Sequence, residues 1–332
     1  MNKDFEISVA PMMDWTDRHC RYFHRLISKH AKLYTEMITT GAILHGDAER
    51  FLRFDKMEHP VALQLGGSEA DDLARSAEIG SKHGYDEINL NCGCPSDRVQ
   101  SGRFGACLML EPDHVADCID AMITASDAPV SVKCRIGIDD QDSFEFLDRF
   151  VDKIGNKGCE TFIIHARSAW LKGLSPKENR DVPPLNYQRV YDVKEKYPQL
   201  RIILNGGVTA MQQIDAAHHL DGVMIGREAY QNPYWLAEIE RKIFGNDAIL
   251  GRDKIARNMM DYIDQQAATY QTPVKSITRH MMGLFHHQPG AKHWRRALSE
   301  YPHEDDATSE AITKALADRL AALKIHAETR KE

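Results

Sequence analysis

The chain has 332 residues, of which 42% are hydrophobic and 27% are charged, and this length fits one large domain plus a smaller one. The composition excludes global disorder, and no apolar run approaches the length of a bilayer-spanning helix. The formal net charge of −7 argues against a nucleic-acid partner unless basic residues gather in one part of the chain.

Eight short apolar segments, most of them rich in Val, Ile and Leu and without strict alternation, follow one another along the chain. They are Ile7–Met13, Leu33–Thr39, Val61–Gly67, Glu87–Asn91, Val130–Gly137, Thr161–Arg167, Arg201–Gly207 and Gly222–Arg227. This pattern is typical of buried parallel strands. Helical patterns lie between them at Glu69–His83, Pro112–Ala125, Ser143–Lys157, Tyr187–Lys196 and Met211–His219.

Eight strand–helix units in about 240 residues predict an α/β fold, a (β/α)8 TIM barrel. A doubly wound sheet is the alternative, but no G-x-G-x-x-G follows the first strand. From about Ala248 the strand pattern stops, and helices are expected at Arg252–Tyr270, Val274–Gly283, Lys292–Leu298 and Ser309–Arg330. We therefore expect a catalytic barrel at 1–243 and a helical domain at 244–332.

In a barrel of this kind, catalysis takes place at the C-terminal ends of the strands. Polar residues or glycines stand at those ends: Pro11–Met13, Glu36, Gln64, Asn91 with Cys94, Lys133, His165 with Arg167, Asn205–Gly207, and Gly226 with Arg227. Any one of them has an ordinary structural explanation, whereas the joint pattern favours a site. The polar loop Leu171–Leu185, which is long for this fold, is expected to be functional, with a flexible insertion as the alternative.

The last two strand ends predict a phosphate site. Gly206, Gly207 and Gly226 allow close backbone approach, and Arg227 adds a positive charge, although two ordinary tight turns would give the same glycines. Gln64 can bond to a heterocycle edge, and Lys133 can face a ring that becomes anionic. This set suits FMN better than a sugar phosphate.

Seven cysteines without secretory features favour free thiols in a reducing compartment, and Met1–Glu6 does not resemble a signal peptide, so we expect a cytoplasmic protein. Cys92 and Cys94 lack the spacing of a zinc site, and no metal is expected. Gly93 and Pro95 hold Cys94 at the barrel mouth. Its thiol could be a nucleophile, a redox thiol or a proton donor, and proton donation suits a flavin enzyme.

The stretch Ile88–Pro95, followed by Val99 and by Gly105-Ala106, is similar to the signature of the tRNA-dihydrouridine synthases. The resemblance extends through Ala10–Met12, Gln64-Leu65, Lys133–Arg135, His165–Arg167, Asn205–Val208 and Gly226-Arg227 into the helical tail, and so covers nearly the whole chain. The tail and the motif spacing look most like the A-type bacterial enzymes, which modify tRNA positions 20 and 20a.

The resemblance implies a role for each matching residue. FMN would be bound by Pro11, Met12, Met13, Gln64, Lys133, His165, Asn205, Gly206, Gly207, Gly226 and Arg227. Cys94 would protonate C5 of the uracil while hydride from FMN, reduced by NADPH, reaches C6. Contacts to tRNA would come from Asn91, Lys177 and Arg180 near the active site and from Lys292, His293, Arg295 and Arg296 in the helical domain.

The segment 275–299 contains five basic residues and no acidic one, and its interleaved His280, Phe285, His286, His287 and Trp294 suggest phosphate binding and base stacking. A solvated helix face with a buried Trp is the alternative. Two other functions stay open: a flavin barrel acting on a free pyrimidine or another small molecule, and a non-catalytic RNA-binding protein. Nothing in the sequence demands assembly, and a monomer is expected.

Overall fold

The computed structural model describes residues 5–304 and 307–329, so residues 1–4 of the expected polar start and the expected helix end at Arg330 lie outside it. The described chain divides into two compact units. The first unit contains the residues up to Thr16 and Lys32–Gly226, and the second contains Asp17–Ala31 and the residues from Arg227 onward. This division assigns residues 17–31 and 227–243 to the unit of the C-terminal helices, unlike the expected boundary at residue 243.

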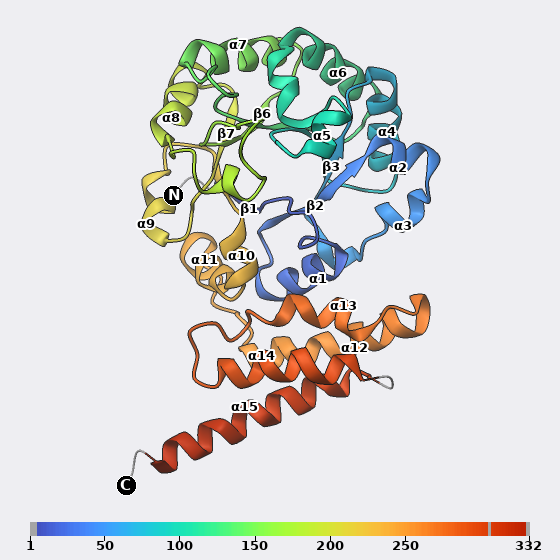
Figure 1. The fold of residues 1–332 in the computed structure, drawn as a ribbon, viewed down its shortest axis with the longest axis vertical. Coiled ribbons are helices and arrows are strands. Elements are labelled where there is room, and N and C mark those ends of the chain that lie inside the picture. The colour runs from blue at the N-terminus through green and yellow to red at the C-terminus, as the bar shows by residue number, and fades with distance from the viewer. Residues whose placement is uncertain (1–4, 305–306, 330–332) are drawn as a thin grey trace. The chain divides into compact units, whose positions relative to one another are not determined.

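The first unit is built on eight parallel strands that close into a barrel, each strand pairing with the next and β8 with β1 (Figure 1). The strands are β1 (Glu6–Val9), β2 (Lys32–Thr39), β3 (Val61–Gly66), β4 (Glu87–Cys92), β5 (Val130–Arg135), β6 (Thr161–His165), β7 (Arg201–Asn205) and β8 (Gly222–Ile225). The predicted (β/α)8 TIM barrel is confirmed.

Helices of the first unit lie around the ring of strands (Figure 1). They are α2 (Thr40–His45), α3 (Ala48–Leu52), η1 (Lys56–Glu58), α4 (Ala70–Lys82), α5 (Asp97–Ser101), η2 (Gly105–Leu110), α6 (Pro112–Ala125), α7 (Phe144–Gly155), η3 (Glu178–Arg180), α8 (Tyr187–Lys196) and α9 (Met211–Ala216). Helix α7 illustrates why they form: Ser143 Oγ accepts from the Phe146 N–H at 3.2 Å, and Leu147, Phe150, Val151 and Ile154 bury one stripe.

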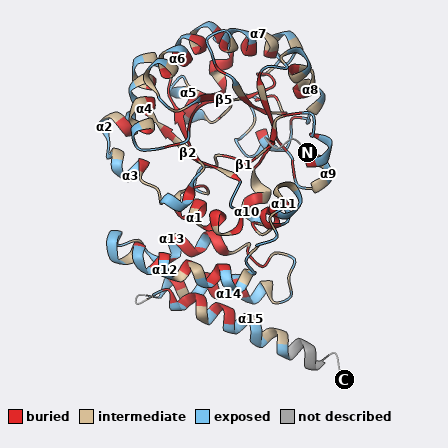
Figure 2. Ribbon diagram, turned by 180° about the vertical axis from the view of Figure 1, so that it is seen from behind, coloured by how far each residue is buried: buried red, intermediate tan, exposed pale blue. Residues whose placement is uncertain are grey.

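The barrel strands are buried on both faces, which explains the apolar runs in strands such as β3 and β7 (Figure 2). A buried cluster inside the barrel consists of Ala10, Tyr34, Ala62, Ile163, Ile203 and Met224. Several strands end earlier than expected because their last residues turn into rim loops. After β1, for example, the N–H groups of Trp15 and Thr16 both donate to Met12 O, so Met12 and Met13 belong to a turn.

The second unit is helical within the described residues. Its elements are α1 (Arg18–Ile27), α10 (Arg227–Gln231), α11 (Trp235–Phe244), α12 (Arg252–Tyr270), α13 (Val274–Thr278), η4 (Arg279–Met281), α14 (Ala291–Glu300), η5 (Tyr301–His303) and α15 (Glu310–Thr329). In the core of this unit the Trp294 ring meets the Phe285 ring edge-on, and Trp294 Nε1 donates to Met281 O. The expectation that Phe285 and Trp294 stack on bases is therefore wrong, because both rings are fully buried.

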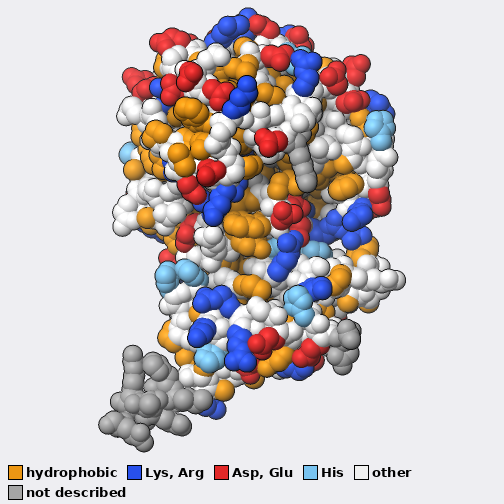
Figure 3. Space-filling view, in the orientation of Figure 1, with side chains coloured by type: hydrophobic (Ala, Val, Ile, Leu, Met, Phe, Trp, Pro, Cys, Tyr) orange, Lys and Arg blue, Asp and Glu red, His pale blue; other side chains and the backbone are white. Residues whose placement is uncertain are grey.

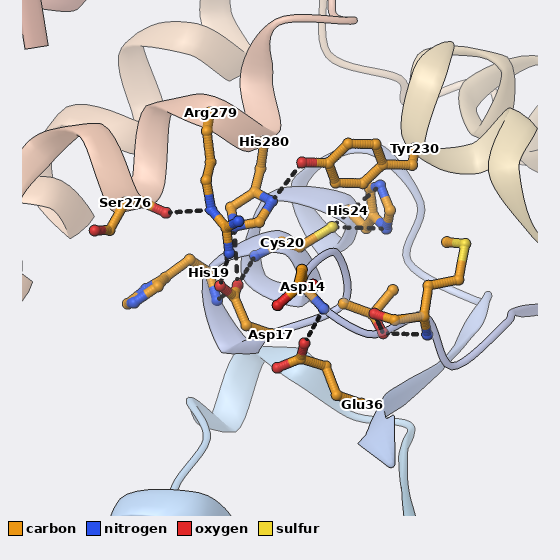
Figure 4. A network of polar contacts seen from close by, with 12 residues as sticks. Asp14, Asp17, His19, Cys20, His24, Glu36, Tyr230, Ser276, Arg279 and His280 are labelled. Atoms are coloured by element: carbon orange, nitrogen blue, oxygen red, sulfur yellow. Dashed lines mark hydrogen bonds and ion pairs between the residues drawn. The ribbon is translucent and has the colours of Figure 1, made fainter. Parts of the chain in front are cut away.

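Helix α1 joins the second unit through polar side chains (Figure 4). Asp17 accepts from the backbone N–H groups of His19 and Cys20, and its carboxylate also pairs with Arg279 and with the buried His280. Burial alone would raise the pKa of Asp17, but the hydrogen bond and charge of His280 hold it far below its usual range. His280 is thus a structural partner of Asp17 and does not face RNA.

None of the helices in the described part of the chain is both long and apolar enough to cross a membrane.

Candidate active site

The rim of the barrel beside β1 is formed by Pro11–Met13. Met12 packs against the buried cluster inside the barrel, while Met13 is 56% exposed. Asp14, with φ of 64°, donates its N–H to Glu36 Oε1 at 2.5 Å, and this bond fixes the turn to the end region of β2. Met12 therefore offers an apolar surface over the middle of the barrel.

Cys94 is held in place by backbone and side-chain bonds at the end of β4. The N–H groups of Gly93 and Cys94 both donate to Asn91 Oδ1 at 3.0 Å. Cys94 O accepts from Ala106 N–H, and a Cβ on Gly105, where φ is 76°, would come within 2.7 Å of that oxygen. The thiol itself stays partly exposed, 3.5 Å from Ser96 Oγ.

The neighbouring Cys92 has a different environment. It is fully buried in β4, and burial raises its pKa well above the usual range for a thiol. Of the two cysteines in the motif, only Cys94 is therefore placed to meet a substrate at the rim.

Lys133 and His165 lie on the next strands of the same rim. Lys133 Nζ donates to Asn205 Oδ1 at 3.0 Å, and Asn205 Nδ2 donates to Met224 O. Burial, followed by repulsion from Arg135, lowers the pKa of Lys133 to about 8. Burial, followed by the charges of Arg135 and Lys133, holds the pKa of His165 well below its usual range, so its ring is neutral.

Two glycines after β7 form a turn with positive φ at both residues. Gly206 and Gly207 have φ of 112° and 65°, and their carbonyls are held by Tyr187 OH at 2.6 Å and Gln213 Nε2 at 3.0 Å. A Cβ on Gly206 would lie 3.2 Å from the His165 ring, and one on Gly207 would lie 2.5 Å from Leu185 Cδ1. Side chains are thus excluded from this turn.

The glycine after β8 is less constrained. A Cβ on Gly226 would meet only Ala10 Cβ, at 3.9 Å. Arg227 follows it directly in the chain as the first residue of α10 and belongs to the second unit.

Two positively charged residues expected to contact RNA, Lys177 and Arg180, lie exposed at η3 in the loop Leu171–Leu185. This loop is tied to the Cys94 loop. Arg135 Nε donates to Gly93 O at 3.1 Å, and its Nη1 donates to Asn179 O at 2.9 Å. The loop is therefore anchored beside the candidate catalytic thiol.

Gln100 makes a second tie, since its Nε2 donates both to Pro95 O at 2.8 Å and to Leu171 O at 2.9 Å. Asn179 then orders the loop from within, accepting from Trp170 N–H and donating to Trp170 O. The sequence reasoning missed Arg135, Asn179 and Gln100 as site-forming residues. Of these three residues, only Arg135 could have been found from the sequence, because it ends the Lys133–Arg135 segment that resembles the family.

The rim fits an anionic, phosphate-bearing ring ligand. Lys133, Arg135, Arg167 and Arg180 all act on His165 as positive charges. His165 Nδ1 is buried and finds no hydrogen-bond partner among the described residues. The turn at Gly206-Gly207 carries no side chain, so its backbone N–H groups are open to close approach by a ligand. Within residues 5–304 and 307–329, no group of three or more His, Cys, Asp or Glu side chains is arranged to hold a metal ion.

The four expected RNA contacts of the second unit, Lys292, His293, Arg295 and Arg296, are all exposed on α14. The opposite face of α14 is buried through Trp294, Ala297 and Leu298. Figure 3 shows Lys, Arg and His side chains together on the visible face of this unit. Arg296 is partly neutralised by Glu300, whose Oε1 accepts from its Nε at 2.9 Å.

A family model described as dihydrouridine synthase matches residues 8–321. The chain belongs to the dihydrouridine synthase family. The resemblance seen in the sequence is thereby confirmed, and so is the expected class of enzyme.

Similar proteins of known name agree over nearly the full length. The chain is 57% identical to the tRNA-dihydrouridine(20/20a) synthase of Vibrio cholerae over 320 residues, which cover 96% of this chain and 97% of the relative. It is 55% identical to the enzyme of the same name from Escherichia coli K12, with 93% and 90% covered.

Solved structures with a similar fold include an old yellow enzyme homologue from Zymomonas mobilis. Its TM-score is 0.52 at 12% identity, with 74% of this chain and 90% of that chain covered. Morphinone reductase gives the same TM-score at 12% identity, with 74% and 87% covered. These two likenesses concern the barrel fold alone.

Proposed function

We propose that this protein is a tRNA-dihydrouridine synthase that reduces uridines 20 and 20a in the D-loop of tRNA, with FMN as cofactor and NADPH as reductant. The observation that carries the proposal is Cys94, a partly exposed thiol fixed at the barrel rim by Asn91 and Gly105. The relatives that are 55–57% identical over nearly the whole chain support the substrate. No observation favours a free pyrimidine.

The rim residues would hold FMN in the following way. The turn at Gly206-Gly207 offers backbone N–H groups without side chains to the phosphate, with Gly226 and Arg227 next to each other in the chain as further contacts. Met12, with Pro11 and Met13 beside it, would lie under the ring. Gln64, Asn205, Lys133 and His165 would complete the set, because they supply polar groups and positive charge at the same rim.

Bound FMN, reduced by NADPH, would supply the hydride that the uracil takes at C6. Cys94 would supply the proton that goes to C5, which fits a partly exposed thiol held at the mouth of the barrel. Asn91 was expected to touch the RNA. Because its amide oxygen is taken by the N–H groups of Gly93 and Cys94, we propose that it positions the thiol instead.

The target uridine must leave its stack to reach the rim, so the rest of the tRNA has to be held elsewhere. Lys177 and Arg180 are exposed on the loop tied to the Cys94 loop and suit phosphates near the flipped nucleotide. The exposed face of α14 would hold the body of the tRNA through Lys292, His293, Arg295 and Arg296.

The test compares two cysteines that are two residues apart. The Cys94→Ala protein should bind FMN and accept electrons from NADPH at the wild-type rate, but lose tRNA reduction by a factor of about 100 or more. Cys92→Ala, which changes a buried thiol, should keep tRNA reduction near the wild-type level. Flavin absorbance under anaerobic conditions follows both the reduction of FMN by NADPH and its reoxidation by tRNA.

Equal tRNA turnover in the wild type and in Cys94→Ala would remove Cys94 from the mechanism. A purified protein that does not take up FMN on reconstitution would contradict the cofactor. Reduction of free uracil as fast as tRNA would instead favour the small-molecule alternative.

A further inference from the structure

Polar residues alternate with apolar ones along β4, in the order Glu87, Ile88, Asn89, Leu90, Asn91. Because successive side chains of a strand point to opposite faces, Glu87, Asn89 and Asn91 share one face. All three are buried, at 4%, 0% and 9% exposure. A column of buried polar groups therefore runs along this strand from its first residue to the loop that carries Cys94.

The upper half of the column begins at the candidate catalytic loop. Asn91 Oδ1 accepts from the N–H groups of Gly93 and Cys94, and Asn91 Nδ2 donates to Gln64 Oε1 at 2.8 Å. Gln64 Nε2 in turn donates to Asn89 Oδ1 at 2.8 Å. Each amide thus accepts on the side of the loop and donates on the side of the barrel interior.

The lower half ends on a carboxylate. Asn89 Nδ2 donates to Ser131 Oγ at 2.7 Å, and Ser131 Oγ donates to Glu87 Oε1 at 2.5 Å. Glu87 also accepts from Tyr34 OH at 2.6 Å and pairs with Lys32 Nζ at 2.8 Å. Burial alone would lower the pKa of Lys32, but Glu87 and Glu6 raise it above its usual value, so Lys32 stays charged at this end.

Chemistry at the two ends fixes the direction of every bond between them. A backbone N–H can only donate and a carboxylate can only accept. Starting from either end, the orientation of all three side-chain amides and of the serine hydroxyl follows without choice. One reversed amide would set two donors or two acceptors against each other in a buried place and leave both groups without a hydrogen-bond partner, which is strongly unfavourable.

We propose that Glu87 and Ser131, at the far end of this chain of hydrogen bonds, are positioning residues for the Cys94 loop. They orient the amides of Asn89, Gln64 and Asn91 so that the Asn91 oxygen faces the loop. Of the residues already assigned to the site, only Gln64 and Asn91 belong to this series of hydrogen bonds. The proposal gives both of their amides a definite orientation. It adds to the proposed function, and it rests on that function only for its effect on catalysis.

The test measures the backbone bonds directly, without tRNA or turnover. Amide hydrogen exchange of the peptide containing Gly93 and Cys94 is compared in the wild type, Ser131→Ala and Tyr34→Phe. Both variants remove one hydroxyl that donates to the same Glu87 oxygen, but only Ser131 lies between Glu87 and the loop. Ser131→Ala should exchange roughly five to ten times faster at this peptide, and Tyr34→Phe should match the wild type.

Wild-type exchange in Ser131→Ala would overturn the proposal. Equal acceleration in both variants would also overturn it, since that outcome indicates general loosening of the barrel. If Ser131→Ala does not fold by circular dichroism, Asn89→Ala interrupts the same series of hydrogen bonds one step nearer the loop without adding bulk at this buried position, and the same two outcomes apply. Hydrogen exchange is measured without substrate. A protein inactive on tRNA would therefore contradict the proposed function, while the exchange data would still test the role of Ser131 and Glu87.

In the active enzyme, Ser131→Ala should lower kcat for tRNA reduction several-fold at unchanged KM, while reduction of the flavin by NADPH keeps its rate. Ser131→Thr, which restores the hydroxyl, should recover part of the loss. If Ser131→Ala slowed both flavin reduction by NADPH and tRNA reduction, the flavin site itself would be damaged. That result would contradict a displaced Cys94 thiol as the cause.

Discussion

Lys133→Met should remove a rise of folding stability with pH that the buried environment of Lys133 produces. In the folded protein the pKa of Lys133 is lowered from 10.5 to about 8, first by burial and then by Arg135. The unfolded chain therefore binds one more proton than the folded protein between these values, so stability rises with pH in this window. Replacing Lys133 removes that dependence.

The magnitude follows from the size of the shift. A pKa shift changes the free energy of unfolding by about 1.4 kcal/mol per pH unit. Between pH 8 and pH 10.5, the free energy of unfolding of the wild-type apoprotein should therefore rise by about 3 kcal/mol relative to that of Lys133→Met. Allowing for solvent at the partly exposed side chain reduces this difference to about 2 kcal/mol. Bound FMN should shrink this difference, because an anionic ligand raises the pKa of a nearby ammonium.

Urea denaturation of both apoproteins across that pH range measures the difference. Lys32→Met is a matched control, because the pKa of Lys32 is raised, chiefly by Glu87 and Glu6 working against burial. The stability contribution of Lys32 is present below its unfolded pKa and is lost only at higher pH, so its difference curve should be flat in the same window. Parallel curves for the wild type and Lys133→Met would refute the reasoning.

Two further predictions concern the ligand and the tRNA. Gly207→Ala and Gly173→Ala both place a side chain at positive φ, 65° and 83°, which costs about 1 kcal/mol of stability in thermal unfolding. Gly207→Ala should cost more than Gly173→Ala, because its Cβ would lie 2.5 Å from Leu185 Cδ1 while nothing lies within 4 Å of a Cβ on Gly173. Only Gly207→Ala should weaken FMN binding, because Gly207 belongs to the proposed phosphate-binding turn and Gly173 does not, and equal FMN affinities would contradict that turn. The double variant Arg295→Glu/Arg296→Glu should weaken tRNA binding about tenfold or more and lower the salt dependence of binding, as measured by filter binding. Lys82→Glu, an exposed change on α4, should leave both unchanged, and unchanged affinity in the double variant would place the tRNA elsewhere.

The barrel could be predicted from the sequence because parallel strands buried on both faces leave short apolar segments, and eight such segments, separated by helical patterns, are visible. Cys94 could be predicted because Gly93 and Pro95 mark it within its own loop. In each case the signal is local. The alternation of Glu87, Asn89 and Asn91 in β4 was equally local, and it would have pointed to a buried polar column.

Other features depend on partners distant in the chain. Arg135 donates hydrogen bonds to Gly93 and Asn179, each more than 40 residues away in the sequence. No local sequence pattern near these three residues predicts the contacts. Helix α1 was not expected because His19, His24 and Arg25 break its apolar stripe, yet all three are buried. Aromatic residues in a basic segment look the same whether they form a core or a stacking surface, and only burial separates the two at Trp294.

The central claim is that this protein reduces uridines 20 and 20a of tRNA. The most direct test incubates unmodified tRNA with the purified full-length protein, FMN and NADPH, and maps dihydrouridine by mass spectrometry of nuclease fragments. We predict a gain of two mass units at positions 20 and 20a, absent without NADPH and absent with Cys94→Ala. No mass change at these positions, or a change confined to other uridines, would contradict the claim.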